Sequence, residues 1–315
     1  MTTHLKRLCA LLTLAGSLAG VTATAYAAGP ACLNLPRDKV GFQLYSVYEV
    51  LTGRLPRPPP GQPFPKPRAS AQQLAGLFKD MAGMGWSNME NFGGTWSVSP
   101  RVYARTVASS GLHAVSSHDD LDQTDWNAVL DRAVAMHQVY VGSGMFGEPG
   151  IDTLDHTLQT AASLEMFGEQ AARRGLKFFV HTHQAEIKTH FDVDLNGEGT
   201  KSSQSVLDIV AAKTDQRYVN FEIDVGWAAA AFGLDQAALV DFLTRHRNRV
   251  VMLHIKDMTA DSKPTDLGRG VLDYSRLIQA AGPQVAYYIW EYDHPPKPLA
   301  SARIAYHYMT CGAGP

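Results

Sequence analysis

The chain has 315 residues, and its 28 Lys and Arg nearly balance its 30 Asp and Glu, for a formal net charge of −2 at pH 7. This balance gives no electrostatic footprint for nucleic acid or for an anionic membrane surface. The length suits one large domain, in particular one parallel barrel of about 250 residues.

Residues 1–27 have the pattern of a secretory signal peptide. Lys6 and Arg7 form a short basic region, residues 8–21 are apolar and small, and Ala25-Tyr26-Ala27 is a cleavage site of the A-x-A kind. A membrane anchor, the alternative, needs about 20 apolar residues, and the Gly, Ser and Thr of this stretch argue against it. We therefore expect a periplasmic or secreted domain of residues 28–315, with no membrane attachment after cleavage.

Apolar runs rich in Val, Ile, Phe and Tyr alternate with amphipathic segments along the rest of the chain. We expect strands at residues 40–46, 86–92, 112–117, 139–142, 178–183, 218–224, 250–254 and 287–291. We expect helices at 70–84, 100–110, 126–133, 154–174, 202–214, 235–246, 273–281 and 298–310. The alternation favours a parallel α/β fold, and eight strands favour a single-domain (β/α)8 TIM barrel over an open sheet.

One segment interrupts this alternation. Residues 53–68 hold seven of the 17 prolines and favour extended polyproline II. They follow the first strand, which on a TIM barrel is the side of the active site. The insertion is either a tolerated surface loop or a stiff wall over the site, and the sequence leaves both open.

Four of the expected strands end in residues able to bind a metal ion, namely His181, Asp224, His254 and Glu291. Their separations of 43, 30 and 37 residues fit consecutive βα units of about 30 residues. Because the C-terminal ends of parallel strands meet on one face, we expect these side chains to converge on one divalent cation. A mixed imidazole and carboxylate set suits Mn, Zn or Fe(II) better than Ca.

Five short strings carry a further signal. They are Phe42-Gln43-Leu44-Tyr45-Ser46-Val47, Val115-Ser116-Ser117-His118, His181-Thr182-His183, Leu253-His254-Ile255-Lys256-Asp257-Met258 and Tyr288-Ile289-Trp290-Glu291-Tyr292-Asp293. Together they resemble the sugar phosphate isomerase/epimerase family, and the resemblance covers about residues 39–310. It implies a xylose-isomerase-like TIM barrel and an enzyme with one divalent metal, often manganese, with Zn, Fe or Mg as alternatives.

The resemblance also implies roles for matched residues. Asp224, His254 and Glu291 match three of the four metal ligands. The first ligand position departs from the usual Glu, because the chain has His181-Thr182-His183 there, which argues against epimerisation by a glutamate pair. Side chains alternate along a strand, so both histidines point to one face. Either one can ligate while the other meets substrate, and either can transfer a proton opposite Glu291.

Further residues near the strand ends are candidates for contact with a sugar: Glu90, His118, Glu186, Trp227 and Lys256. Lys256 is placed to hold an oxyanion, and Trp227 can stack on a sugar ring. Plain alternatives stand beside these roles. Glu90 can be a salt-bridge partner, Glu186 a solvated carboxylate, Trp227 a core residue and Lys256 a surface lysine.

Cys32 and Cys311 are the only cysteines beyond the expected signal peptide. Barrel closure brings the first strand beside the last helix, so the two can pair in an oxidising compartment. Two free thiols are the alternative.

These features predict an exported, metal-dependent, isomerase- or epimerase-like enzyme. Since phosphorylated sugars are chiefly intracellular, export favours a non-phosphorylated sugar, such as a keto-sugar or a 3-keto-glycoside, with proton transfer next to a metal-bound carbonyl. A lyase or hydrolase that cleaves a 3-keto-glycoside and a sugar-binding barrel without turnover are the alternatives. The sequence sets neither the sugar nor the oligomeric state.

Overall fold

A computed structural model describes residues 32–54, 68–122, 125–195 and 197–312 of the chain. The expected signal peptide and residues 55–67 of the proline-rich insertion lie outside the described residues. Within the described ranges, no helix is long and apolar enough to cross a membrane.

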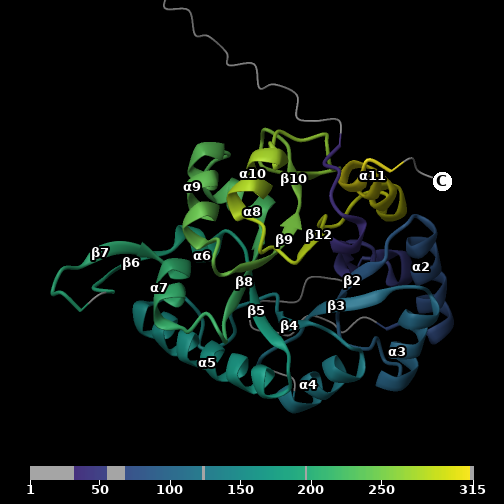
Figure 1. Cartoon of the computed structure of the whole chain (residues 1–315), viewed down its shortest axis with the longest axis horizontal. Helices are drawn as coiled ribbons and strands as arrows, with labels where there is room; N and C mark the ends of the chain where they lie inside the picture. The colour runs from purple at the N-terminus through teal and green to yellow at the C-terminus, as the bar shows by residue number, and fades with distance from the viewer. Residues whose placement is uncertain (1–31, 55–67, 123–124, 196, 313–315) are drawn as a thin grey trace, which may run out of the picture.

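Parallel strands close into a barrel in the order β1-β12-β9-β8-β5-β4-β3-β2 (Figure 1). They are β1 (Val40–Gln43), β2 (Asn88–Phe92), β3 (His113–His118), β4 (Tyr140–Ser143), β5 (Lys177–Thr182), β8 (Asn220–Asp224), β9 (Val250–Ile255) and β12 (Tyr287–Trp290). The closed eight-stranded barrel confirms the (β/α)8 prediction.

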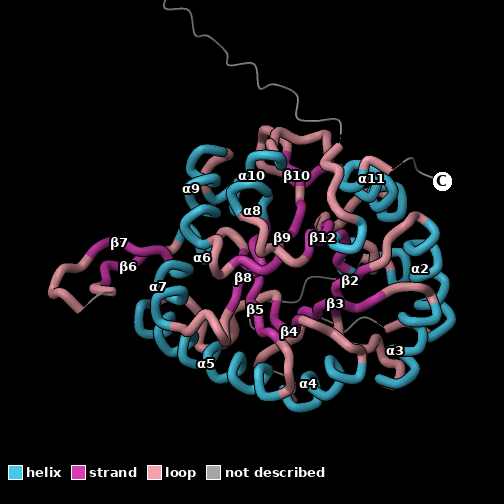
Figure 2. Tube along the Cα trace, in the orientation of Figure 1, coloured by secondary structure: helices cyan, strands magenta, loops and turns pink. Residues whose placement is uncertain are grey.

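Helices form a ring around the barrel (Figure 2). The longer ones are α2 (Ala71–Gly83), α3 (Pro100–Ser109), α4 (Trp126–Ala135), α5 (Leu154–Arg173), α7 (Val206–Lys213), α9 (Gln236–His246), α10 (Tyr274–Ala281) and α11 (Pro298–Thr310). Helix α2 shows why they form: Ser70 and Gln73 make a capping box at its start, and Leu74, Leu77, Phe78 and Met81 share the buried face.

Short elements that the sequence analysis did not expect surround the C-terminal ends of the strands. They are α1 (Glu49–Thr52), α6 (Ala185–Lys188), α8 (Val225–Ala231), the antiparallel pair β6 (His190–Val193) and β7 (Ser202–Ser205), and the pair β10 (Asp257–Met258) and β11 (Pro264–Thr265). The β6–β7 hairpin projects from the barrel at the left of Figure 1.

Two predicted boundaries were wrong for local reasons. The first strand ends at Gln43 instead of residue 46, because the Gln43 side chain accepts the Tyr45 N–H at 3.2 Å and begins a 3-10 turn. The helix expected over 202–214 begins at Val206, because Ser205 caps it by accepting the Asp208 N–H at 3.1 Å. Residues 202–205 form β7.

The barrel interior is apolar at its base and polar above it. Tyr140, Phe179 and Met252 form a small apolar cluster of their own. Gly142 leaves room for it, since a Cβ there would lie 2.1 Å from the Phe179 carbonyl oxygen. His181 and His254 come two residues later on β5 and β9, about 7 Å nearer the C-terminal ends. The polar residues of the site therefore stand on an apolar floor.

A disulfide joins Cys32 to Cys311, which are 279 positions apart in sequence and have Cα atoms 5.2 Å apart. It ties the segment before β1 to the end of α11. Two backbone hydrogen bonds run beside it, from Leu33 N to Tyr308 O at 2.7 Å and from Leu35 N to Met309 O at 2.8 Å. The bond links the pair of cysteines that the sequence singled out.

We predict that the double variant Cys32→Ser/Cys311→Ser loses about 2–5 kcal/mol of unfolding free energy, because the unfolded chain regains the entropy that a long cross-linked loop removes. Urea denaturation of the oxidised protein measures the loss. Reductant should destabilise the wild type and leave the double variant unchanged. Two titratable thiols in oxidised, denatured wild-type protein would contradict the bond.

Candidate metal centre

Ionisable side chains fill the C-terminal half of the barrel interior. The buried ones are Glu90, His181, Glu222, Asp224, His254, Lys256 and Glu291, and His118 is half-buried. They come from β2, β3, β5 and β8, from β9 and the residue after it, and from the residue after β12. The topology thus gathers charges that lie far apart in sequence into one water-poor space.

The four residues predicted as metal ligands lie together. His181, Asp224, His254 and Glu291, called here the outer set, offer ligand atoms that all lie within 4.8 Å of one another. His181 Nε2 is 3.8 Å from Asp224 Oδ2, and His254 Nδ1 is 2.5 Å from Glu291 Oε2. The other oxygen of Asp224 accepts the Trp227 N–H at 2.9 Å and so caps α8, which fixes the carboxylate.

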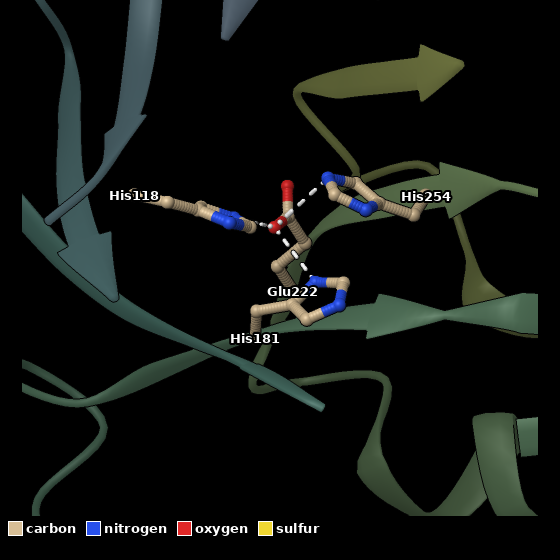
Figure 3. Close-up of side chains that lie close together, drawn as sticks. All are labelled: His118, His181, Glu222 and His254. Atoms are coloured by element: carbon tan, nitrogen blue, oxygen red, sulfur yellow. Dashed lines mark hydrogen bonds and ion pairs between the residues drawn. The ribbon is translucent and has the colours of Figure 1, made fainter. Parts of the chain in front are cut away.

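A second group lies deeper in the barrel. His118, His181, Glu222 and His254, called here the inner set, also offer ligand atoms within 4.8 Å of one another. Figure 3 shows the three imidazoles pointing at one oxygen, Glu222 Oε2, which lies 2.7 Å from His118, 3.0 Å from His181 and 3.1 Å from His254. Sequence reasoning missed Glu222, although an acid two residues before Asp224 in an otherwise apolar strand shares its inward face.

Glu90 completes the inner layer. Its Oε1 lies 2.7 Å from His254 Nε2 and 3.1 Å from His118 Nε2, and it accepts the Gln43 side-chain N–H at 2.7 Å. The register of strand pairing is irregular at both glutamates: it shifts at Glu90 between β2 and β3, and at Glu222 between β8 and β9. Such irregularities re-aim side chains beside functional sites. Here they set both glutamates against histidines of the neighbouring strands.

Lys256 is buried among carboxylates. Its Nζ lies 2.6 Å from Asp224 Oδ2, 3.2 Å from Glu291 Oε2 and 2.6 Å from Asp293 Oδ2. Gly226 makes this packing possible, because a Cβ there would lie 2.6 Å from the Lys256 carbonyl oxygen. The surface alternative for Lys256 was therefore wrong. Its ammonium also lies 4.9 Å from the ring centroid of the half-buried Trp227.

The electrostatics of the outer layer keep Lys256 and Glu291 charged. Burial disfavours the ammonium, but Asp224 and Glu291 raise the pKa of Lys256 above its usual value. Burial favours the neutral form of Glu291, but Lys256 and His254 hold the pKa of that carboxyl well below its usual range. Glu291 is therefore an ionised oxygen donor throughout the neutral pH range.

The histidines divide into two kinds. Burial opposes charge on His118, yet Glu90 and Glu222 raise its pKa to about 10. Burial, and then the neighbouring His254, lower the pKa of His181 well below its usual value. Burial, and then Lys256, lower the pKa of His183 to about 4. Neutral His181 and His183 have the free lone pair that a ligand or a base needs.

The remaining predicted residues frame the site. Glu186 is 3% exposed and accepts the His183 backbone N–H at 2.8 Å, so it is neither solvated nor free in a loop. Two unpredicted residues follow strands at the same rim, Tyr45 after β1 and His294 after β12. The Tyr45 hydroxyl is 3.1 Å from His294 Nε2, and His294 Nδ1 is 2.5 Å from Glu49 Oε1. Tyr45 stands in the first of the five strings that resemble the family, and this position could have marked it as a candidate site residue.

Compared by sequence, the chain matches no protein-family model and no curated protein. Among solved structures, a sugar phosphate isomerase/epimerase from Parabacteroides distasonis has a TM-score of 0.63 at 18% identity, over 86% of this chain and 93% of that one. A xylose isomerase-like TIM barrel protein from Mycobacterium smegmatis, solved with magnesium, has a TM-score of 0.59 at 13% identity, over 86% of this chain and 95% of that one. A D-allulose 3-epimerase from Methylomonas sp. has a TM-score of 0.56 at 12% identity, over 90% of this chain and 98% of that one. The chain thus has the fold of the xylose isomerase-like TIM barrels.

We predict that Lys256→Met lowers the unfolding free energy of the chelator-treated protein by about 3–5 kcal/mol, because it leaves buried carboxylates unpaired. Added Mn2+ should recover part of the loss. Urea denaturation with chelator and with Mn2+ measures both values. The matched control is Lys263→Met, since Lys263 is 75% exposed in its pair with Asp261 and its loss should leave stability nearly unchanged. Equal stability of Lys256→Met and wild type in chelator would contradict the buried network.

Proposed function

We propose that the chain is an exported, metal-dependent isomerase- or epimerase-like enzyme for a non-phosphorylated sugar. One observation carries the proposal: Glu90, Glu222, Asp224 and Glu291 are buried in one interior, where Lys256 is the only buried lysine among the described residues. Buried charges without partners cost several kcal/mol each. The four carboxylates face one ammonium and two imidazoles, those of His118 and His254, whose pKa values the carboxylates raise against the effect of burial. A net negative charge remains in the interior, and it favours a bound divalent cation that would take the place of the imidazole protons.

The residues present fit such an ion. The outer set would hold it through two imidazoles and two carboxylates, a donor mixture suited to Mn, Zn, Fe(II) or Mg. Manganese is our first choice. When bound, the ion would polarise a sugar carbonyl and stabilise the enediolate-like charge that forms when a neighbouring proton leaves. One structural neighbour was solved with magnesium.

The His181/His183 pair divides its two tasks. His181 is 2% exposed and both its ring nitrogens face carboxylates, so it suits ligation. His183 is partly exposed, and its ring stands edge-on to His181 with the centroids 4.7 Å apart. Its lowered pKa keeps it neutral at pH 7. We assign His183 to proton transfer at the substrate, opposite Glu291.

Other groups are placed to orient a sugar. The Lys256 ammonium can donate to the oxygen that gains charge when the proton leaves. Trp227, Tyr45 and His294 are partly exposed, and an aromatic face of this kind packs on the C–H face of a sugar ring. The chain's own residues thus supply both the polar and the apolar contacts of a small carbohydrate.

The substrate class follows from export. The signal-peptide pattern of residues 1–27 favours a periplasmic or secreted location. Since phosphorylated sugars are chiefly intracellular, a free sugar, a keto-sugar or a 3-keto-glycoside fits this location better. A D-allulose 3-epimerase of this fold was solved with D-allulose bound. In this chain His181-Thr182-His183 stands where epimerases place a glutamate. That asymmetry favours cleavage of a 3-keto-glycoside, which begins with the same proton removal, as the second candidate.

We predict that the protein turns over a member of a panel of keto-sugars and 3-keto-glycosides, and that in D2O deuterium enters the carbon beside the carbonyl. Glu291→Gln should lower turnover by about 100-fold or more, because the carboxylate that accepts the proton is lost. Mass spectrometry and NMR of the products measure both. Glu169→Gln, on the exposed face of α5, is the control and should keep full activity.

Turnover without deuterium exchange, or a fully active Glu291→Gln variant, would remove Glu291 from this role. Binding of a sugar without any product would instead identify a sugar-binding barrel. Epimerised and cleaved products distinguish the two enzymatic candidates directly.

A further inference from the structure

The inner set has a geometry that hydrogen bonding alone leaves unsatisfied. Three histidine nitrogens converge on Glu222 Oε2, and two of them, from His118 and His254, also lie within 3.1 Å of Glu90 Oε1 (Figure 3). Each ring nitrogen carries at most one hydrogen, so the nitrogens of His118 and His254 must each divide one N–H between two carboxylate oxygens. Meanwhile Glu222 Oε1 and Glu90 Oε2 are buried without a hydrogen-bond partner.

Buried polar atoms in native proteins almost always have partners, so each unpaired oxygen needs an explanation. Both glutamates are 0% exposed, which excludes bulk water as the partner. Metal–ligand bonds of about 2.0–2.2 Å place ligand atoms up to about 4 Å apart, close to the span of the inner set. A cation there would displace the protons that these nitrogens carry, accept the three imidazole lone pairs and engage both carboxylates.

We propose that His118, His181, Glu222 and His254 form a second metal position, deeper than the outer set and selective for Zn2+ or Co2+. Three nitrogens and a carboxylate are the donor set that such borderline cations prefer, and Mg2+ and Ca2+ prefer oxygen. Glu90 lies against two of the four ligands and supplies the remaining negative charge.

The inner position is chemically distinct from the outer one although the two share His181 and His254. His181 turns Nδ1 to Glu222 and Nε2 to Asp224, and His254 turns Nε2 to Glu222 and Nδ1 to Glu291. Because a neutral imidazole has one lone pair, each shared histidine ligates one position at a time. The two positions therefore compete for one resident ion, and the histidine tautomers decide between them.

The inference rests on the proposed metal dependence through these two histidines alone. His118 and Glu222 belong only to the inner set, and Asp224 and Glu291 belong only to the outer set. Variants at these residues therefore separate the two positions. The experiments can therefore reject the inner position and support the outer one, or support the inner position and reject the outer one.

The first test is a titration of purified, chelator-treated protein with Co2+, followed by visible absorption. A nitrogen-rich, four-coordinate Co2+ site absorbs far more strongly than a six-coordinate, oxygen-rich one. We expect His118→Ala and Glu222→Gln each to lose the strong band and to weaken Co2+ binding by about 100-fold or more, since even outer partners of ligands cost 10–100-fold. The matched variant Asp224→Asn should keep the band. Unchanged Co2+ binding and spectrum in both inner variants would overturn the proposal.

The second test uses wild-type protein and so does not depend on the folding of a variant. Crystals grown with Zn2+ should give an anomalous peak within about 2.0–2.2 Å of His118 Nε2 and Glu222 Oε2. A peak bonded to Asp224 and Glu291 and absent at His118 would overturn the inner position while supporting the outer one. Mn2+ affinity that is unaffected by Asp224→Asn would count against the outer position alone.

Discussion

The constraint on which the rest of the structure depends is charge compensation inside a closed barrel. Parallel strands all end at one rim, so acids at the ends of β2, β8 and β12 are forced into the same interior, where water cannot screen them. The chain answers this with one buried lysine in the outer layer and with two imidazoles in the inner layer, those of His118 and His254, whose pKa values the carboxylates raise against the effect of burial. Such a centre costs stability, which must come from elsewhere: the apolar floor of Tyr140, Phe179 and Met252, the apolar helix faces, and the Cys32–Cys311 closure of the chain ends.

Local backbone details hold the charged groups where compensation works. Asp224 is both the N-cap of α8 and the ion-pair partner of Lys256, so the same carboxylate starts the helix and belongs to the site. The next residue after Lys256 does similar work, because the Asp257 carboxylate accepts the backbone N–H groups of Gly268 at 3.0 Å and Gly270 at 2.9 Å and pins the loop after β9. Lys256 is thus held from both sides, by Gly226 at the start of α8 and by this loop. A flexible lysine becomes a fixed cation.

The sequence predicts the barrel well because its information is local: apolar runs mark strands, and a ligand-type residue at the end of such a run points to the catalytic rim. The outer set, Lys256 and the cysteine pair follow from position along the chain and from barrel closure. The role of Glu222 cannot be predicted in this way, because Glu222 lies within an apolar run and its histidine contacts depend on the pairing register of β8. His118 likewise was expected to touch sugar, and its place against Glu222 depends on the register shift at Glu90. Pairing irregularities, and ion pairs such as Lys256–Asp293, arise from tertiary geometry that no single segment encodes.

His181 and His254 belong to both the inner set and the outer set, so the two sets are coupled. A ligating imidazole binds through one nitrogen and usually donates its other N–H to a carboxylate, which fixes the tautomer and raises its basicity. For an ion at the outer set, Glu222 and Glu90 are those carboxylates, at 3.0 Å from His181 Nδ1 and 2.7 Å from His254 Nε2. Glu222 and Glu90, which are fully buried, thereby decide which histidine nitrogens face the outer set. The protonation or metal content of the inner layer must consequently alter the affinity of the outer layer, since both draw on the same two lone pairs.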